Sequence, residues 1–202
     1  MTTAHRPYKG VAATDRIAER RAALREACLE IVGEQGATAV SAEGVCRIAG
    51  LTKRYFYESF RDRDALLLAI LEEFLVKVET EAIAAIEGVC RTERPRVVVD
   101  VLVQALAADA RVARLFADSP AVQVLRERRN TAVETFVVLL RDHVLPFRDV
   151  PARTPAHDIV TRIIVAGTTD VISAWVHGLI DADRTVLADS ILNAGLAIAH
   201  NS

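Results

Sequence analysis

The sequence predicts an all-α protein, and three observations point to that fold class. Apolar residues make up 51% of the 202-residue chain, and most of them are Ala, Val, Leu and Ile. The chain has only 9 Gly and 6 Pro, so few residues interrupt helices. No segment shows a sustained alternation of apolar and polar residues, which would indicate strands. We therefore expect about nine helices.

The first expected helix covers about residues 15 to 34. Asp15 can act as its N-cap, because a carboxylate accepts a hydrogen bond from an unpaired backbone N–H of the first turn. Gly36 ends the helix, since glycine takes the left-handed conformation at little cost. Residues at helical spacing should form its apolar face: Ile17, Leu24, Cys28 and Ile31.

Two short helices with a tight turn between them are expected next. Ser41 is a good N-cap for the segment AEGVCRIA, and Gly50 stops that segment. Thr52 is a second candidate N-cap, and it opens the segment KRYFYES. The spacing is that of a helix-turn-helix. The apolar face of the first short helix should consist of Val45, Ile48 and Ala49.

The second short helix, within LTKRYFYESF, combines aromatic residues with cations. Four of the chain's aromatic residues (6 Phe, 3 Tyr and 1 Trp in all) fall within these ten positions. Phe56 and Phe60 are four residues apart, so they share one face and should pack inward. Lys53, Arg54 and Tyr57 lie on other faces. Such a surface fits the major groove of DNA, where Lys and Arg bind phosphates or guanine edges. The alternative is an ordinary surface amphipathic helix.

The remainder of the chain predicts longer helices. Asp62 can cap a helix that continues to about Ile86, and its apolar stripe consists of Leu66, Leu67, Ile70, Leu71, Phe74, Leu75 and Val78. Pro120 and Pro155 suit first helical turns, whereas Pro146 and Pro151 mark a loop. Further helices are expected at about residues 95–108, 110–117, 120–145, 155–178 and 184–199.

The net charge of −2 conceals a small asymmetry along the chain. Residues 1 to 63 contain 11 Lys and Arg against 8 Asp and Glu, a net charge of +3. Residues 64 to 202 contain 14 (25 − 11) against 19 (27 − 8), a net charge of −5. A basic first third is compatible with a nucleic-acid contact near the N-terminus.

From about residue 20 to residue 71, the chain resembles the N-terminal domain of TetR-family transcriptional regulators. The matching residues follow the family order without a gap: Gly36, Ser41, Ile48-Ala49, Gly50-Leu51-Thr52, Tyr57, Phe60, Arg63 and Leu66-Leu67. The resemblance implies a helix-turn-helix DNA-binding domain at residues 14–62. It also implies a helical domain at residues 63–202 that binds an effector and dimerises.

The resemblance also implies roles for single residues. Ser41 and Thr52 would bind phosphates as helix caps, and Tyr57 and Arg63 would also contact the DNA backbone. Lys53, Arg54 and Tyr55 are the candidate base contacts of the recognition helix. Tyr55 and its neighbour Phe56 are bulkier than the pair often found there, so packing of Tyr55 in the core remains an open alternative.

The C-terminal part should form a homodimer and a ligand pocket. The helices at about 155–178 and 184–199 have extensive apolar surface, which fits a four-helix bundle between two subunits as well as the core of one chain. Candidate pocket residues are apolar and polar side chains of the later helices: Phe74, Val78, Leu102, Leu106, Phe116, Phe136, Leu140, His143, Thr169, Asp170, Trp175 and His177. We expect Asp170 to have a partner, because it interrupts an otherwise apolar helix.

Together these features predict a ligand-responsive transcriptional repressor rather than an enzyme. It would bind a near-palindromic operator in double-stranded DNA as a homodimer, and a small apolar effector would release it. The alternative is a helical dimeric scaffold or an enzyme without DNA binding. The five His residues are scattered and form no metal or catalytic motif, so neither a metal nor a cofactor is expected.

The location expected for the protein is the cytoplasm. The three cysteines form no C-x-x-C pair, which favours a reduced compartment. The N-terminal MTTAHRPYKG lacks the apolar core of a signal peptide. The longest weakly polar run, Ile163 to Val176, is broken by Asp170 and is expected to be too short to span a bilayer, so no membrane contact is expected.

Overall fold

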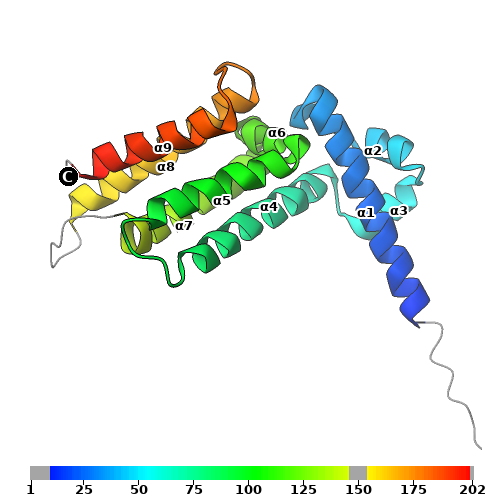
Figure 1. Ribbon diagram of the computed structural model, residues 1–202. Helices are drawn as coiled ribbons and strands as arrows, with labels where there is room; N and C mark the ends of the chain where they lie inside the picture. The colour runs from blue at the N-terminus through cyan, green and yellow to red at the C-terminus, as the bar shows by residue number, and fades with distance from the viewer. Residues whose placement is uncertain (1–9, 146–153, 201–202) are drawn as a thin grey trace, which may run out of the picture.

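The computed structural model describes residues 10–145 and 154–200, and within them the chain forms nine α-helices and no strand (Figure 1). This confirms the all-α prediction. The α-helices are α1 (Gly10–Gln35), α2 (Ala42–Ala49), α3 (Lys53–Ser59), α4 (Arg63–Ile86), α5 (Arg94–Ala108), α6 (Ala110–Asp118), α7 (Gln123–Leu139), α8 (Pro155–Val176) and α9 (Arg184–His200). Three short elements join them: the 3-10 turns η1 (Ala37–Ala39) and η2 (Ser119–Ala121), and the π-helical turn η3 (Leu140–Val144).

Helices α1, α2 and α3 gather at one end of the molecule, and α4 to α9 form a layered bundle at the other (Figure 1). A single apolar core nevertheless runs through both groups. It includes Leu24 of α1, Val45 of α2, Phe56 of α3, Leu66 of α4 and Ile172 of α8, each of them fully buried. The position of the short helices is therefore fixed by the same core that holds the bundle.

The expected caps explain where α2 and α4 begin. The Ser41 hydroxyl accepts a hydrogen bond from the Gly44 N–H at 3.1 Å, and Asp62 accepts one from the Ala65 N–H at 2.8 Å. Gly50 ends α2 in the left-handed conformation, with φ 64°. Thr52 occupies the N-cap position of α3, but its side chain accepts no capping hydrogen bond.

Three expected helix boundaries were wrong. Helix α1 begins at Gly10 rather than at Asp15, because no proline or glycine interrupts residues 11–14 and Ala is the best helix former. Pro120 lies in η2, and α7 begins only at Gln123. The expected helix at 120–145 therefore divides into η2, α7 and η3. Pro146 and Pro151 lie outside the described residues.

Two residues expected on buried faces are exposed. Ile17 is 55% exposed, because the N-terminal part of α1 extends past the helices that cover its middle (Figure 1). Ile48 is 37% exposed, since the buried face of α2 is centred between Val45 and Cys46 and Ile48 falls at its edge. The other residues expected on the apolar face of α1 (Leu24, Cys28 and Ile31) are buried.

Helices α8 and α9 pack beside each other along one side of the bundle (Figure 1). Gly195 of α9 is buried and faces α8, because a Cβ there would make an ordinary contact with Ile164 at 3.6 Å. The outer side of the pair is apolar and open. Ile159 is 60% exposed, Ile163 53% and Val186 52%.

Helix α8 corrects the expectation that its apolar run is too short to span a bilayer. The helix extends back to Pro155, and by length and composition it could cross a membrane. Length and composition of one helix are weak grounds for a membrane span. Of its most apolar window, 22% is buried, and other residues of the helix are partly buried against the bundle.

Candidate nucleic-acid interface and effector cavity

Helix α3 has one buried face and one exposed face, as its residue pattern predicts. Phe56 is fully buried and Phe60 is 4% exposed, so these two rings fix the helix to α1 and α2. Lys53, Arg54 and Tyr57 are exposed. The Tyr57 ring meets Phe56 edge-on, with ring centroids 5.3 Å apart, while the residue as a whole is 57% exposed.

Both cations of α3 are paired with carboxylates on the same surface. Lys53 Nζ lies 2.9 Å from Glu43 Oε2 of α2, and Arg54 Nε lies 2.9 Å from Glu58 Oε1. The hydrogen bond to Lys53 lowers the pKa of Glu43 and raises that of Lys53. Exposed ion pairs contribute little net stability, so either cation can exchange its carboxylate for another anion at small cost.

Tyr55 packs against α1 instead of pointing freely away from α3. Its ring is half-buried and lies under the guanidinium of Arg20, 4.2 Å from the ring centroid. Arg20 also pairs with Glu58 at 3.7 Å. The neighbouring Arg21 donates to the Ser59 carbonyl at 2.8 Å and covers the Phe60 ring. Two arginines of α1 therefore hold the C-terminal half of α3.

Arg63 braces the connection that precedes α2. Its Nη1 donates to the carbonyl oxygens of Val40 at 3.0 Å and Thr38 at 3.3 Å, and its Nε donates to Asp64 at 2.9 Å. These bonds engage the guanidinium within the protein. The Ser41 and Thr52 side chains are exposed at the same end of the molecule.

An apolar cavity of about 110 Å³ lies inside the bundle. Helices α4 to α9 all contribute to its walls, and nearly all of its lining is hydrocarbon. A cavity with this composition, enclosed by several helices, is typical of a small-molecule site.

Seven of the expected pocket residues line this cavity: Phe74, Val78, Leu102, Phe116, Phe136, Leu140 and Thr169. Whether they bind a ligand stays a prediction. The rings of Phe74 and Phe116 contact each other in this wall in a tilted arrangement, with centroids 5.7 Å apart.

Five expected pocket residues lie elsewhere. Leu106 belongs to the packed core and is 1% exposed. The Trp175 ring packs with α5 and α9, and its Nε1 donates to the Ala182 carbonyl at 2.8 Å. His143 is exposed on η3, and Asp170 is exposed, so Asp170 does not need the partner we expected. The fifth residue, His177, pairs with Asp118 outside the cavity.

The sequence reasoning missed most of the cavity's remaining walls, including Arg129, which is the one charged lining residue in the part of the chain that the structure describes. The residue spacing on α7 could have indicated that Arg129 faces inward. Ala132, Val133 and Phe136 follow Arg129 at three, four and seven residues, which places Arg129 on the apolar face of α7. Other residues of this wall were hidden because their inward direction depends on the tertiary packing: Leu75, Pro95, Val98, Val99, Val144, Leu145, Ile164, Val165, Thr168, Ile172, Ile191, Leu192, Gly195 and Leu196.

Helix α6 connects the cavity with the end of α1. Its Phe116 lines the cavity, and Asp118, two residues later, accepts a hydrogen bond from the Ala37 N–H at 2.8 Å. The other carboxylate oxygen of Asp118 lies 2.9 Å from His177 Nε2, just beyond α8. Asp118 thus ties η1, α6 and α8 together.

A second contact between α1 and α6 lies at the opposite end of α6 from Asp118. Arg111 Nη1 lies 2.5 Å from Glu26 Oε1, and Nη2 lies 2.8 Å from Asp109 Oδ2. Gly33 permits this approach, because a Cβ there would lie 2.9 Å from Cγ of Arg111. We call Glu26, Gly33, Ala37, Arg111 and Asp118 the α1–α6 joint.

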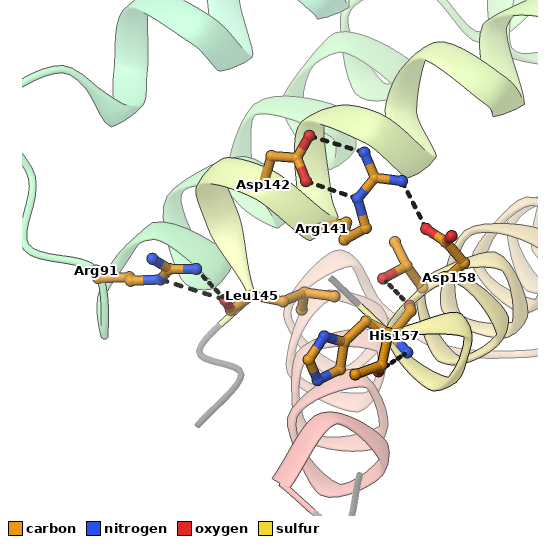
Figure 2. A network of polar contacts seen from close by, with 8 residues as sticks. Arg91, Arg141, Asp142, Leu145, His157 and Asp158 are labelled. Atoms are coloured by element: carbon orange, nitrogen blue, oxygen red, sulfur yellow. Dashed lines mark hydrogen bonds and ion pairs between the residues drawn. The ribbon is translucent and has the colours of Figure 1, made fainter. Parts of the chain in front are cut away.

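A polar network closes the bundle beside the cavity, where η3 meets α8 (Figure 2). The buried Arg141 guanidinium binds both oxygens of Asp142, at 2.6 and 2.7 Å, and Asp158 Oδ1 at 2.6 Å (Figure 2). Arg91 donates to the carbonyl of Leu145, whose side chain lines the cavity. These bonds fix the cavity wall on η3, and they stabilise a buried cation by pairing it.

Several proteins of similar sequence or structure are transcriptional regulators. No family model matches the chain. The HTH-type transcriptional regulator BetI from Rhizobium meliloti (strain 1021) is 35% identical over 78 residues, which span 39% of this chain and 38% of BetI. The match thus spans well under half the length of that relative.

Two solved structures share the fold over most of the chain. A TetR-like transcriptional regulator from Rhodococcus sp. RHA1 has a TM-score of 0.71 and 15% identity, and the match covers 88% of this chain and 94% of that one. FadR from Bacillus subtilis, solved in complex with stearoyl-CoA, has a TM-score of 0.68 and 17% identity, and the match covers 89% and 99%. The chain therefore has the fold of the TetR-like regulators, which confirms the resemblance predicted from its first quarter.

Proposed function

We propose that this protein is a transcriptional regulator of the TetR type, not an enzyme, and that α3 is its recognition helix. The observation that carries the proposal is the divided surface of α3, with Phe56 and Phe60 buried and Lys53, Arg54 and Tyr57 exposed. The fold similarity to solved regulators and the partial match to BetI support it.

The proposed DNA-binding domain covers residues 14–62. Lys53 and Arg54 exchange their carboxylate partners for phosphates or guanine edges when the helix enters the major groove. Ser41, Thr52 and Tyr57 contact phosphates from the same end of the molecule. Tyr55 contributes mainly by holding α3 against Arg20. Arg63 reaches the DNA backbone from the start of α4 by giving up its hydrogen bonds to the Thr38 and Val40 carbonyls.

The proposed effector and dimerisation domain covers residues 63–202. A small apolar molecule in the cavity displaces Phe116, and α6 carries the displacement through the α1–α6 joint to the recognition helix. Release of DNA then requires that the effector bind the displaced arrangement more tightly. We propose a repressor that such an effector releases. The acyl chain of the ligand in the FadR structure supports an apolar effector.

The proposed homodimer forms through the open apolar face of α8 and α9, at about residues 155–178 and 184–199. The exposed side chains of Ile159 and Ile163 lie one turn apart on α8, and Val186 is exposed on α9. Two α3 helices related by a two-fold axis then bind a near-palindromic operator, whose half-sites are spaced to match the dimer. Such a protein acts in the cytoplasm, where the chromosome of a bacterium is accessible.

Selection from a genomic fragment pool tests the proposal. The purified protein is incubated with short duplex fragments, and bound fragments are recovered at increasing salt. We expect enrichment of fragments that contain a near-palindrome, with affinity that falls steeply as salt rises. Retention of no fragment at any salt concentration would favour the alternative, a helical dimeric scaffold without DNA binding.

A further inference from the structure

Among the residues that the structure describes, the cavity wall contains one cation, Arg129, and no carboxylate in that part of the chain binds it. Arg129 lies on α7 among apolar neighbours, and its guanidinium is 5.6 Å from the ring centroid of Phe116. Its buried Nε has no hydrogen-bond partner within the described residues. A buried donor without a partner carries a desolvation penalty, so its retention in an apolar wall needs a reason.

The other two arginines near Arg129 on α7 have hydrogen-bond partners. Arg126 is exposed and donates to the Pro120 carbonyl at 3.2 Å. Arg128 is paired with both carboxylate oxygens of Glu72. The contrast singles out Arg129, which is the one arginine of this segment directed into the cavity.

Asp170 is the carboxylate whose charge acts on Arg129, but it forms no ion pair with it. Asp170 of α8 is exposed, and no ion pair within 4.0 Å joins it to Arg129. Burial lowers the pKa of the Arg129 guanidinium, and Asp170 opposes this only as a distant charge. Arginine nevertheless remains protonated at neutral pH, so the cavity holds a fixed positive charge.

We propose that the effector of this protein is an apolar molecule with a single anionic head, such as a carboxylate, that pairs with Arg129. This inference rests on the proposed function, and it names the chemical class of the effector. The hydrocarbon part occupies the apolar cavity, where a volume of about 110 Å³ accommodates a short chain or one ring. The planar guanidinium binds a carboxylate through two parallel hydrogen bonds.

Thr168 and Thr169 of α8 also line the cavity. The Thr169 hydroxyl donates to the Ala166 carbonyl of its own helix at 2.8 Å, so its oxygen can still accept but its proton is engaged. The wall therefore provides one strong anion donor and hardly any acceptor for a cationic head. This composition selects an acid over an amine.

Three probes with the same chain test the charge preference directly. Octanoate, octan-1-ol and octylamine are titrated into the purified protein, and binding is followed by isothermal titration calorimetry. We expect octanoate to bind about 10- to 100-fold more tightly than octan-1-ol, on the scale of one charge-assisted hydrogen-bonded contact. Octylamine should bind more weakly than the alcohol. Equal binding of the three probes, or no binding of octanoate, would overturn the proposal.

The variant Arg129→Met separates the charge from the shape of the side chain. It should lose the preference for octanoate while its affinity for octan-1-ol stays within about threefold. Arg126→Met, on the same helix but outside the cavity, should bind all probes as the wild type does. An unchanged preference for octanoate in Arg129→Met would contradict the assignment. Duplex binding by Arg129→Met without probe is measured in parallel, because it reports on the proposed regulator function independently of the effector.

Discussion

Gly36 shows at the scale of one residue how closely α1 and α6 approach. Its backbone has φ 87° and ψ 166°, which lies outside the left-handed helical region that we expected and in a region open almost only to glycine. A Cβ at this position would lie 3.0 Å from Asp118 Oδ2, the atom that binds the Ala37 N–H. Glycine is therefore required here both by the backbone and by the contact.

Substitution of this glycine should destabilise the protein. Gly36→Ala is expected to lower the free energy of unfolding by about 1–3 kcal/mol, because the backbone is strained and the bond from Ala37 to Asp118 is disturbed. Urea denaturation followed by circular dichroism measures the change. Gly178→Ala is the matched control. Gly178 has φ 73° with open space around it, so its variant should lose only about 1 kcal/mol. Equal losses in the two variants would contradict the role of the Asp118 contact.

Single residues also mark the limit of prediction from the sequence. The inward direction of Phe56 and Phe60 could be predicted, because two residues four positions apart share one face of a helix. The position of Tyr55 does not follow, since it depends on Arg20 in another helix. Trp175 and His177 failed as pocket residues for the same reason: their partners, Ala182 and Asp118, are defined only by the tertiary structure.

At the scale of an element, the caps of α2 and α3 separate stability from DNA binding. Ser41→Ala removes a capping hydrogen bond and should lower the free energy of unfolding by about 1 kcal/mol. Thr52→Ala removes no such bond, so its stability should stay within about 0.5 kcal/mol of the wild type. Both variants should bind duplex DNA more weakly. Urea denaturation and equilibrium duplex binding measure the two effects.

Comparison of Ser41→Ala with Thr52→Ala gives each variant a control. A stability loss in Thr52→Ala as large as in Ser41→Ala would show that the Thr52 side chain supports α3 in a way that the structure does not record. Unchanged duplex binding in both variants would remove these two residues from the proposed interface.

Elements as a whole were easier to predict than their ends. The existence of α4, α8 and α9 follows from long apolar stripes, which local spacing defines. The change from α7 to the π-helical turn η3 could not be predicted, because Arg141 in that turn binds Asp158 of α8. The cavity is also a property of several elements at once, so its lining could be predicted only in part.

At the scale of the whole molecule, the open apolar face of α8 and α9 predicts a dimer. Ile163→Asp places a charge in the centre of that face and should shift the protein toward the monomer, because an interface excludes unpaired charges. Sedimentation velocity at several protein concentrations measures the mass.

A second exposed isoleucine, on another helix, serves as the control. Ile83 on α4 is 44% exposed, and Ile83→Asp should leave the dimer intact. A dimer that persists in Ile163→Asp would place the subunit contact on another surface. A wild-type protein that sediments as a monomer would contradict the proposed dimer altogether.

The measurement that tests the central claim most directly compares salt-dependent duplex binding of the wild type and the double variant Lys53→Ala, Arg54→Ala. The control is Lys77→Ala, Arg126→Ala, which removes two exposed cations remote from α3. We expect the α3 variant to lose specific binding, and its slope of log affinity against log salt to fall by about 0.9 for each lost phosphate contact. The control should keep wild-type affinity and slope. An α3 variant that binds the selected duplex with the affinity and salt dependence of the wild type would contradict the account.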